Sequence, residues 1–111
     1  MYILPRETES SIQTSICEYL SVRKYFFWRQ NTAPAVNKSK DGWSFRRMPK
    51  HSRRGVPDII VVKQGQFIGL EVKRPGTYQS PEQKAFEKDV AHAGGQYHVV
   101  RSIDDVVAIG L

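Results

Sequence analysis

Two carboxylates and a lysine are spaced in this sequence so that they can meet on neighbouring strands. Asp58 opens the apolar run 58–62, and Glu71 and Lys73 close a second extended run, 67–73. Side chains in a strand alternate between its two faces, so Glu71 and Lys73 are expected to point the same way. Two carboxylates that meet across paired strands repel each other unless a cation lies between them.

This set of side chains suits the hydrolysis of a phosphodiester bond. Hard divalent cations such as Mg²⁺ or Mn²⁺ take oxygen ligands and keep several bound waters. The bound cation lowers the pKa of a water and polarises the phosphate, while a nearby lysine holds that water or neutralises charge in the transition state. The residues therefore favour a metal-dependent nuclease site built from Asp58, Glu71 and Lys73.

The strands that hold these residues can be predicted from the pattern around them. The short segment 63–66 reads as a turn, so runs 58–62 and 67–73 are expected to form an antiparallel hairpin. The aromatic-rich segment 25–30 and the segment 96–100 are predicted as two further strands.

Three helices are predicted around these strands. The first spans about 8–21, where apolar residues recur at helical spacing. The second begins at Ser80 as N-cap, with Pro81 and Gln83 completing the start signal, and ends at Gly94 and Gly95. The third is short, from Ser102 through 107. The order of elements predicts an α/β fold with a central mixed sheet flanked by helices.

A basic segment lies between the first predicted strand and the hairpin. It is predicted as a long loop, 31–54, with a short strand around 43–47. The segment has seven Lys and Arg residues and a single acid, Asp41. Its excess of positive charge therefore equals the net charge of the whole chain, +6. Basic residues with Trp43 and Phe45 among them suit a phosphate backbone with some base stacking, although a solvated loop kept soluble by charge is the plainer alternative. The candidate DNA-binding residues are Lys38, Lys40, Arg46, Arg47, Lys50, Arg53 and Arg54.

Composition narrows the class of protein. A chain of 111 residues has the length of one domain, 1–111, and its 40% hydrophobic and 25% charged residues are globular values. No segment matches a membrane-spanning helix or a signal peptide, and Cys17 is the only cysteine, so an intracellular, cytoplasmic location is expected. The three histidines do not show a zinc spacing.

Several motifs together resemble one known family. Gly55-Val56-Pro57-Asp58 followed by Glu71-Val72-Lys73 resembles the PD-(D/E)xK nuclease superfamily. The order of the whole set is similar to a stand-alone VRR-NUC domain of the Holliday-junction-resolvase-like kind. The further motifs are Glu9 with Ile12-Gln13 in the first helix, Ser80 with Gln83, and Gly94-Gly95 before the last strand. The resemblance covers the chain from Glu9 onward and implies a restriction-endonuclease-like core.

The resemblance also implies a role for each motif residue. Asp58 and Glu71 would be ligands of Mg²⁺ or Mn²⁺, with the backbone carbonyl of Val72 as a third oxygen. Lys73 would act on the water or the phosphate. Glu9 would bind a water or a second metal, and Gln83 would orient Lys73, the water or a phosphate oxygen. The expected activity is that of an endonuclease that cuts branched or otherwise structured DNA.

Each of these residues also has a purely structural explanation. Glu9 suits the first turn of any helix, and Gln83 suits the capping box of Ser80. Asp58 could cap the start of its strand, and Lys73 could extend along apolar surface towards water. One alternative function, a nucleic-acid-binding module with a degenerate site, is disfavoured because every expected polar side chain is present.

A homodimer is also expected. The chain is small for a catalytic domain, and a two-fold dimer would supply the two symmetric cuts that a four-way junction requires. Alternation would place Phe26 and Trp28 on one face of their strand and Tyr25 and Phe27 on the other, so one pair could be interfacial. The competing explanation is that helices cover both faces and all four aromatic residues belong to the core.

Overall fold

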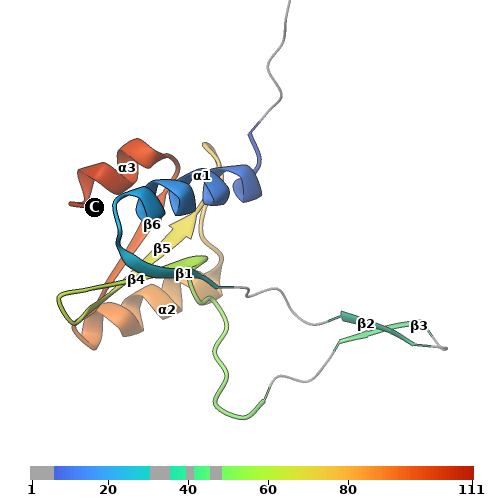
Figure 1. Cartoon of the computed structure of the whole chain (residues 1–111). Coiled ribbons are helices and arrows are strands. Elements are labelled where there is room, and N and C mark those ends of the chain that lie inside the picture. The colour runs from blue at the N-terminus through green and yellow to red at the C-terminus, as the bar shows by residue number, and fades with distance from the viewer. Residues whose placement is uncertain (1–6, 31–35, 40–41, 46–48) are drawn as a thin grey trace, which may run out of the picture.

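The computed structural model describes residues 7–30, 36–39, 42–45 and 49–111 (Figure 1). The described part contains three helices and six strands. In chain order these are α1 (Glu9–Val22), β1 (Phe26–Arg29), β2 (Val36–Ser39), β3 (Gly42–Phe45), β4 (Ile59–Lys63), β5 (Gln66–Val72), α2 (Pro81–His92), β6 (Gln96–Val100) and α3 (Ile103–Ala108).

Four of the strands form one mixed sheet in the order β1-β4-β5-β6. β4 pairs antiparallel with both β1 and β5, as the short turn between β4 and β5 predicts, whereas β5 and β6 run parallel. The parallel pair is joined by the crossover through α2, which is the connection that parallel strands require. The predicted α/β fold with a mixed central sheet is therefore confirmed.

Helices cover the two faces of this sheet unequally (Figure 1). α1 and α3 pack together on one face, and their apolar residues join those of the sheet in a single core. α2 lies against β6 on the other face, where Phe86 packs on Tyr97 with ring centroids 6.2 Å apart. The residues of α2 are all at least partly exposed, so Phe86 and Val90 on its inner side form a thinner layer than the α1 side. The fully buried core residues on the face covered by α1 and α3 include Ile16, Leu20, Ile59, Val61, Leu70, Val72, Val100 and Val106.

The helix boundaries follow local capping chemistry. Thr8 caps α1 and shares a capping box with Ser11, while Ser80 caps α2 with Gln83 as its partner. Ser102 caps α3, as its place before the short apolar segment predicts. In each case the cap hydroxyl accepts a backbone N–H that the helix itself leaves without a partner.

The aromatic strand β1 alternates as predicted. Tyr25, just before β1, and Phe27 pack against the core, whereas Phe26 and Trp28 are 68% and 41% exposed. The explanation in which all four aromatic residues belong to the core is therefore wrong, because the face of β1 that carries Phe26 and Trp28 is the face that α1 does not cover.

The basic segment contains more regular structure than its predicted long loop. β2 and β3 pair antiparallel as a two-stranded sheet of their own, with Ser39 opposite Gly42. β3 corresponds to the strand expected at 43–47, and β2 was missed by the sequence analysis. Asp41-Gly42, a pair typical of hairpin connections, was the available signal. Lys40, Arg46 and Arg47 lie outside the described residues.

No helix in the described part of the chain is both long and apolar enough to span a bilayer.

Candidate active site

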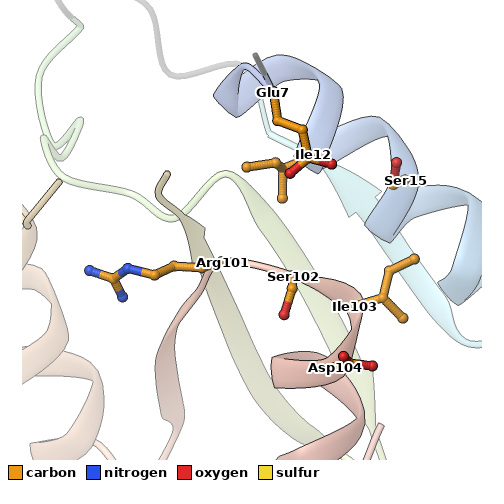
Figure 2. A pocket seen from close by; sticks show the side chains of 7 residues that line it. All are labelled: Glu7, Ile12, Ser15, Arg101, Ser102, Ile103 and Asp104. Carbon is orange, nitrogen blue, oxygen red and sulfur yellow. The ribbon is translucent and has the colours of Figure 1, made fainter. Parts of the chain in front are cut away.

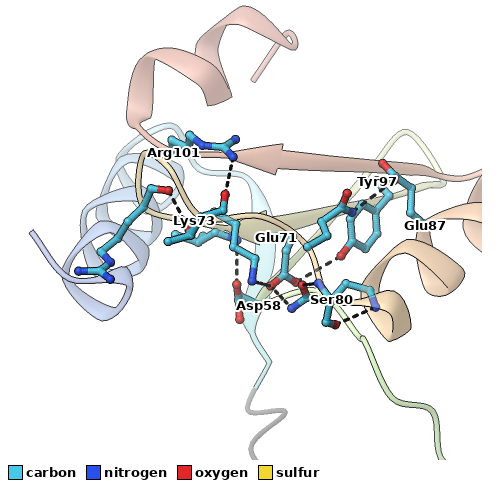
Figure 3. Close-up of polar contacts among 12 residues, drawn as sticks. Asp58, Glu71, Lys73, Ser80, Glu87, Tyr97 and Arg101 are labelled. Carbon is cyan, nitrogen blue, oxygen red and sulfur yellow. Dashed lines mark hydrogen bonds and ion pairs between the residues drawn. The ribbon is translucent and has the colours of Figure 1, made fainter.

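Asp58 and Glu71 come together where β4 begins and β5 ends (Figure 3). The Oδ2 atom of Asp58 accepts the backbone N–H of Val72 at 2.8 Å, which fixes the carboxylate beside the last residue of β5. Glu71 is the only buried charged residue among those described, with 3% of its surface exposed. The hairpin predicted from the sequence therefore brings the two acids to one place.

The ladder between β4 and β5 ends before it reaches Asp58. Its last pair on this side is Ile59 with Leu70. Beyond that pair, the backbone N–H of Val72 is bound by the side chain of Asp58. The N–H and C=O of one residue in an extended strand point to the same edge, so the Val72 carbonyl is directed to the side of Asp58.

Two glycines allow the segment before Asp58 to pass close to its neighbours. A side chain at position 69 would bring its Cβ within 2.6 Å of the Pro57 ring, so Pro57 can pack on β5 there because Gly69 has no side chain. Gly55 has a φ of +78°, and a Cβ there would lie 2.3 Å from the carbonyl oxygen of Glu82 at the start of α2. These contacts hold the Gly-x-Pro-Asp segment between β5 and the first turn of α2.

Three side chains surround the carboxylate of Glu71 (Figure 3). Gln83 Nε2 donates to its Oε1 at 2.7 Å, and the Tyr97 hydroxyl donates to its Oε2 at a longer 3.4 Å. Lys73 Nζ lies 4.0 Å from Oε1, and both partners of this ion pair are largely buried. The predicted proximity of Glu71 and Lys73 on one face of the strand is therefore present.

Burial and mutual repulsion change the pKa values of the two acids. Burial raises the pKa of Asp58, although the Val72 N–H opposes the shift. Burial, with the Asp58 charge next, raises the pKa of Glu71 to about 8. The Lys73 charge opposes both shifts. A pKa of about 8 keeps Glu71 largely protonated at neutral pH when no cation is bound.

The third acid, Glu9, approaches this pair from the first turn of α1. It is half-buried, and its negative charge contributes to the raised pKa of Asp58. The capping box of α1 is formed by Thr8 and Ser11, so Glu9 is not required for that role. The structure thus places Glu9 within electrostatic range of Asp58.

The oxygen atoms gathered here fit a hard divalent cation. Within residues 7–30, 36–39, 42–45 and 49–111, no group of three or more His, Cys, Asp or Glu residues is suited to hold a metal ion. The candidate donors are therefore the carboxylates of Asp58 and Glu71 and the carbonyl of Val72, with water for the remaining positions. A cation bound here would displace the Glu71 proton, because the ligand form of the carboxyl group is the ionised one.

Comparison with known proteins identifies the same architecture elsewhere. No family model matches the sequence, and no curated protein matches it either. A solved structure described as "VRR_NUC domain protein" aligns with 96% of this chain and 87% of its own, at 20% identity and a TM-score of 0.65. A second, described as "VRR_NUC domain", covers 91% of each chain at 20% identity and a TM-score of 0.62. The chain has the VRR-NUC fold.

The predicted DNA-binding residues differ in their surroundings within this VRR-NUC fold. Lys50 and Arg54 are exposed, whereas Arg53 forms an ion pair with Asp89 and lies 5.5 Å above the Phe86 ring. Arg53 is therefore used in part to attach its segment to α2. Lys38 lies in β2, and Lys40, Arg46 and Arg47 are outside the described residues.

Two residues of this VRR-NUC fold were missed by the sequence analysis. Tyr97 contacts Glu71 from β6, which could not be foreseen because the register of a parallel neighbour is set by the fold. Burial and the Glu71 charge raise the pKa of Tyr97, so its hydroxyl stays a neutral donor. Arg29 binds the first turns of α1 through Gln13, and this contact explains the motif position of Gln13.

A separate hollow lies on the α1 and α3 side of the VRR-NUC fold (Figure 2). Its volume is about 190 Å³, and no residue of the acid pair lines it. Arg101 extends from it to donate to the carbonyl of Thr77 at 2.7 Å. The lining residues are Glu7, Ile12, Ser15, Arg101, Ser102, Ile103 and Asp104.

Proposed function

We propose that this protein is an endonuclease of the PD-(D/E)xK type that uses Mg²⁺ or Mn²⁺ to hydrolyse phosphodiester bonds in DNA. One observation carries the proposal: the carboxyl groups of Asp58 and Glu71 meet at the end of the β4–β5 ladder, where Asp58 accepts the backbone N–H of Val72 and Glu71 is buried. The VRR-NUC fold supports it, because the structures that share this fold are described as VRR_NUC domains.

The residues divide the chemistry among them. Asp58, Glu71 and the Val72 carbonyl would hold the cation, which supplies an activated water and polarises the phosphate when bound. Lys73 stands beside Glu71 with its ammonium group ready to neutralise charge on the phosphate as the bond breaks. Gln83 orients Glu71, and Glu9 adds a carboxylate for a bound water or a second cation.

The proposed substrate is branched or otherwise structured DNA, with the four-way Holliday junction first among the candidates. We propose that the protein acts on it as a homodimer, because two symmetric cuts require two sites related by a two-fold axis. Sedimentation across a concentration series tests the assembly. A monomer at concentrations where junctions are cut would overturn the dimer and favour flaps or nicks, where one cut is enough.

Cleavage of defined substrates tests the activity itself. The purified protein is incubated with forks, flaps, nicks and four-way junctions in Mg²⁺ or Mn²⁺, with EDTA as the control. Asp58→Ala and Glu71→Ala should abolish cleavage while binding survives or strengthens, because each removes negative charge that repels phosphate. Wild-type cleavage by either variant would overturn the metal site. Binding without cleavage by the wild type would establish the alternative, a degenerate nucleic-acid-binding module.

A further inference from the structure

Phe26 and Trp28 form an exposed aromatic pair on β1, at the edge of the four-stranded sheet. They are 68% and 41% exposed, and their ring centroids lie 6.0 Å apart with the planes tilted by 54°. Large apolar side chains grouped on a surface mark a place where something binds. We call this pair the β1 aromatic shelf.

The β1 aromatic shelf lies on the same face of the sheet as the acids. Trp28 pairs with Ile60, and the backbone N–H of Gln30 continues the ladder by donating to the Asp58 carbonyl at 2.7 Å. Residues 28, 60, 58 and 71 therefore alternate onto one face. One strand spacing across and two residues along separate Trp28 from Asp58, which is about 8 Å between Cα atoms.

The indole of Trp28 is held in place on both sides. Its Nε1 donates to the side-chain oxygen of Gln30 at 3.0 Å, and Phe26 packs against it from the other direction. An aromatic ring that is already oriented loses little conformational entropy when a flat partner stacks on it. The shelf thus presents a preformed π surface beside the acid pair.

A fixed cation lies at the strand edge next to the shelf. Neither β1 nor β4 contains an acidic residue, and Arg29 follows Trp28 at the end of β1. Its side chain alternates to the face opposite Trp28, where it contacts only neutral side chains of α1 among the described residues: Gln13 at 2.9 Å, Ser10 at 3.2 Å and Thr14 at 3.4 Å. Arg29 is exposed, so a DNA strand that stacks on Trp28 and passes round the edge of β1 would bring a phosphate to this guanidinium.

We propose that the β1 aromatic shelf stacks unpaired nucleobases of the DNA strand whose phosphate lies at the acid pair. This inference rests on the proposed function and names what that site selects. Stacking on Trp28 requires an open base face, which a continuous duplex hides and a branch point, a flap or a melted end exposes. The shelf accordingly favours distorted DNA without reading its sequence.

Fluorescence of Trp28 tests the proposal without any cleavage. Trp43→Phe leaves Trp28 as the single tryptophan, because the chain has two. In EDTA this protein is titrated with a single-stranded oligonucleotide, a duplex of the same length, and a strand of abasic sites. We expect strong quenching by the single strand and little by the other two, since only the single strand offers free bases.

Substitutions of Trp28 distinguish base stacking from general electrostatic attraction to DNA. Trp28→Ala should weaken single-strand binding about tenfold, the effect of losing one stacked base, and leave duplex binding unchanged. Trp28→Phe should keep most of the affinity. Val107→Ala, which alters an exposed apolar residue on α3, is the matched control and should change neither.

Three outcomes would overturn the shelf. Equal quenching by the abasic strand would mean contact with the backbone only. A shift of Trp28 emission with protein concentration alone would assign the surface to a second copy of the chain. Unchanged affinity in Trp28→Ala would remove the role of stacking. If the wild type then cleaves junctions in Mn²⁺, only the shelf has failed; if it cleaves nothing, the proposed nuclease function has failed.

Discussion

Gln83 Nε2 donates to Glu71 Oε1 at 2.7 Å, while the other end of the same amide accepts the backbone N–H of Ser80 at 2.8 Å. One side chain thus completes the capping box of α2 and orients a buried carboxyl group. The structural and the catalytic explanations of Gln83 were alternatives in the sequence, and both contacts are present in the structure. A glutamine is suited to this because its amide has a donor end and an acceptor end.

Gln83→Ala and Ser80→Ala should therefore differ in one property. Each removes part of the capping box, which lowers the free energy of unfolding by about 1 kcal/mol. Only Gln83→Ala also frees the Glu71 carboxyl group, so its cleavage rate should fall by about 10- to 100-fold. Thermal melts and single-turnover cleavage measure the two effects. Equal cleavage by both variants would show that Gln83 acts through the helix alone.

Metal affinity should depend on pH because the Glu71 proton must leave before a cation binds. Burial, with the Asp58 charge next, raises the Glu71 pKa to about 8 in the cation-free protein. Below that value, affinity for Mn²⁺ should fall by about tenfold per pH unit, and above it the dependence should level off. Calorimetric titration between pH 6 and pH 9 measures this. A flat profile across that range would contradict the raised Glu71 pKa.

The stability of the cation-free protein should fall as pH rises. The folded Glu71 pKa, about 8, is above its ordinary value of 4.5, so between these values the folded state binds more protons than the unfolded chain. Folding is then favoured at low pH, and up to about 5 kcal/mol is lost as the pH passes through this window. Thermal melts in EDTA from pH 5 to pH 9 test the sign. Glu71→Gln should show a flatter profile.

The basic segment should contribute to binding through phosphate contacts. Replacing Arg46, Arg47, Arg53 and Arg54 by alanine should weaken binding across all DNA sequences. Each lost contact should reduce the slope of log affinity against log salt by about 0.9. Arg53→Ala alone should change the slope least, because Arg53 is already paired with Asp89. A slope that stays the same in the fourfold variant would show that this segment does not contact the backbone.

The strands and helices were predictable because their signals are local. The turn at 63–66 sets the β4–β5 register, and alternation along each strand then brings Asp58 and Glu71 to one face. Ser80, Pro81 and Gln83 mark the start of α2 through contacts within one helical turn. The hairpin of β2 and β3 was overlooked although the sequence Asp41-Gly42 is typical of hairpin connections.

The remaining parts of the site depend on contacts between distant segments. Tyr97 reaches Glu71 only because β6 returns parallel to β5, a register that no short-range pattern encodes. The ion pair of Arg53 with Asp89 joins residues 36 positions apart, so a residue predicted to bind DNA is engaged in the fold. The unequal cover of the sheet by α1 and α2 likewise decides which aromatic residues of β1 are exposed.

The contact of Pro57 with Gly69 has a consequence for how copies of this protein diverge. Any side chain at position 69 would bring its Cβ within 2.6 Å of the Pro57 ring, so the segment that ends in Asp58 would have to move away from β5. The chain would still carry both acids. Loss of the proposed activity can therefore begin at a residue that has no functional group of its own. Position 69 is the place in a gene to look for an inactive copy whose carboxylates are intact.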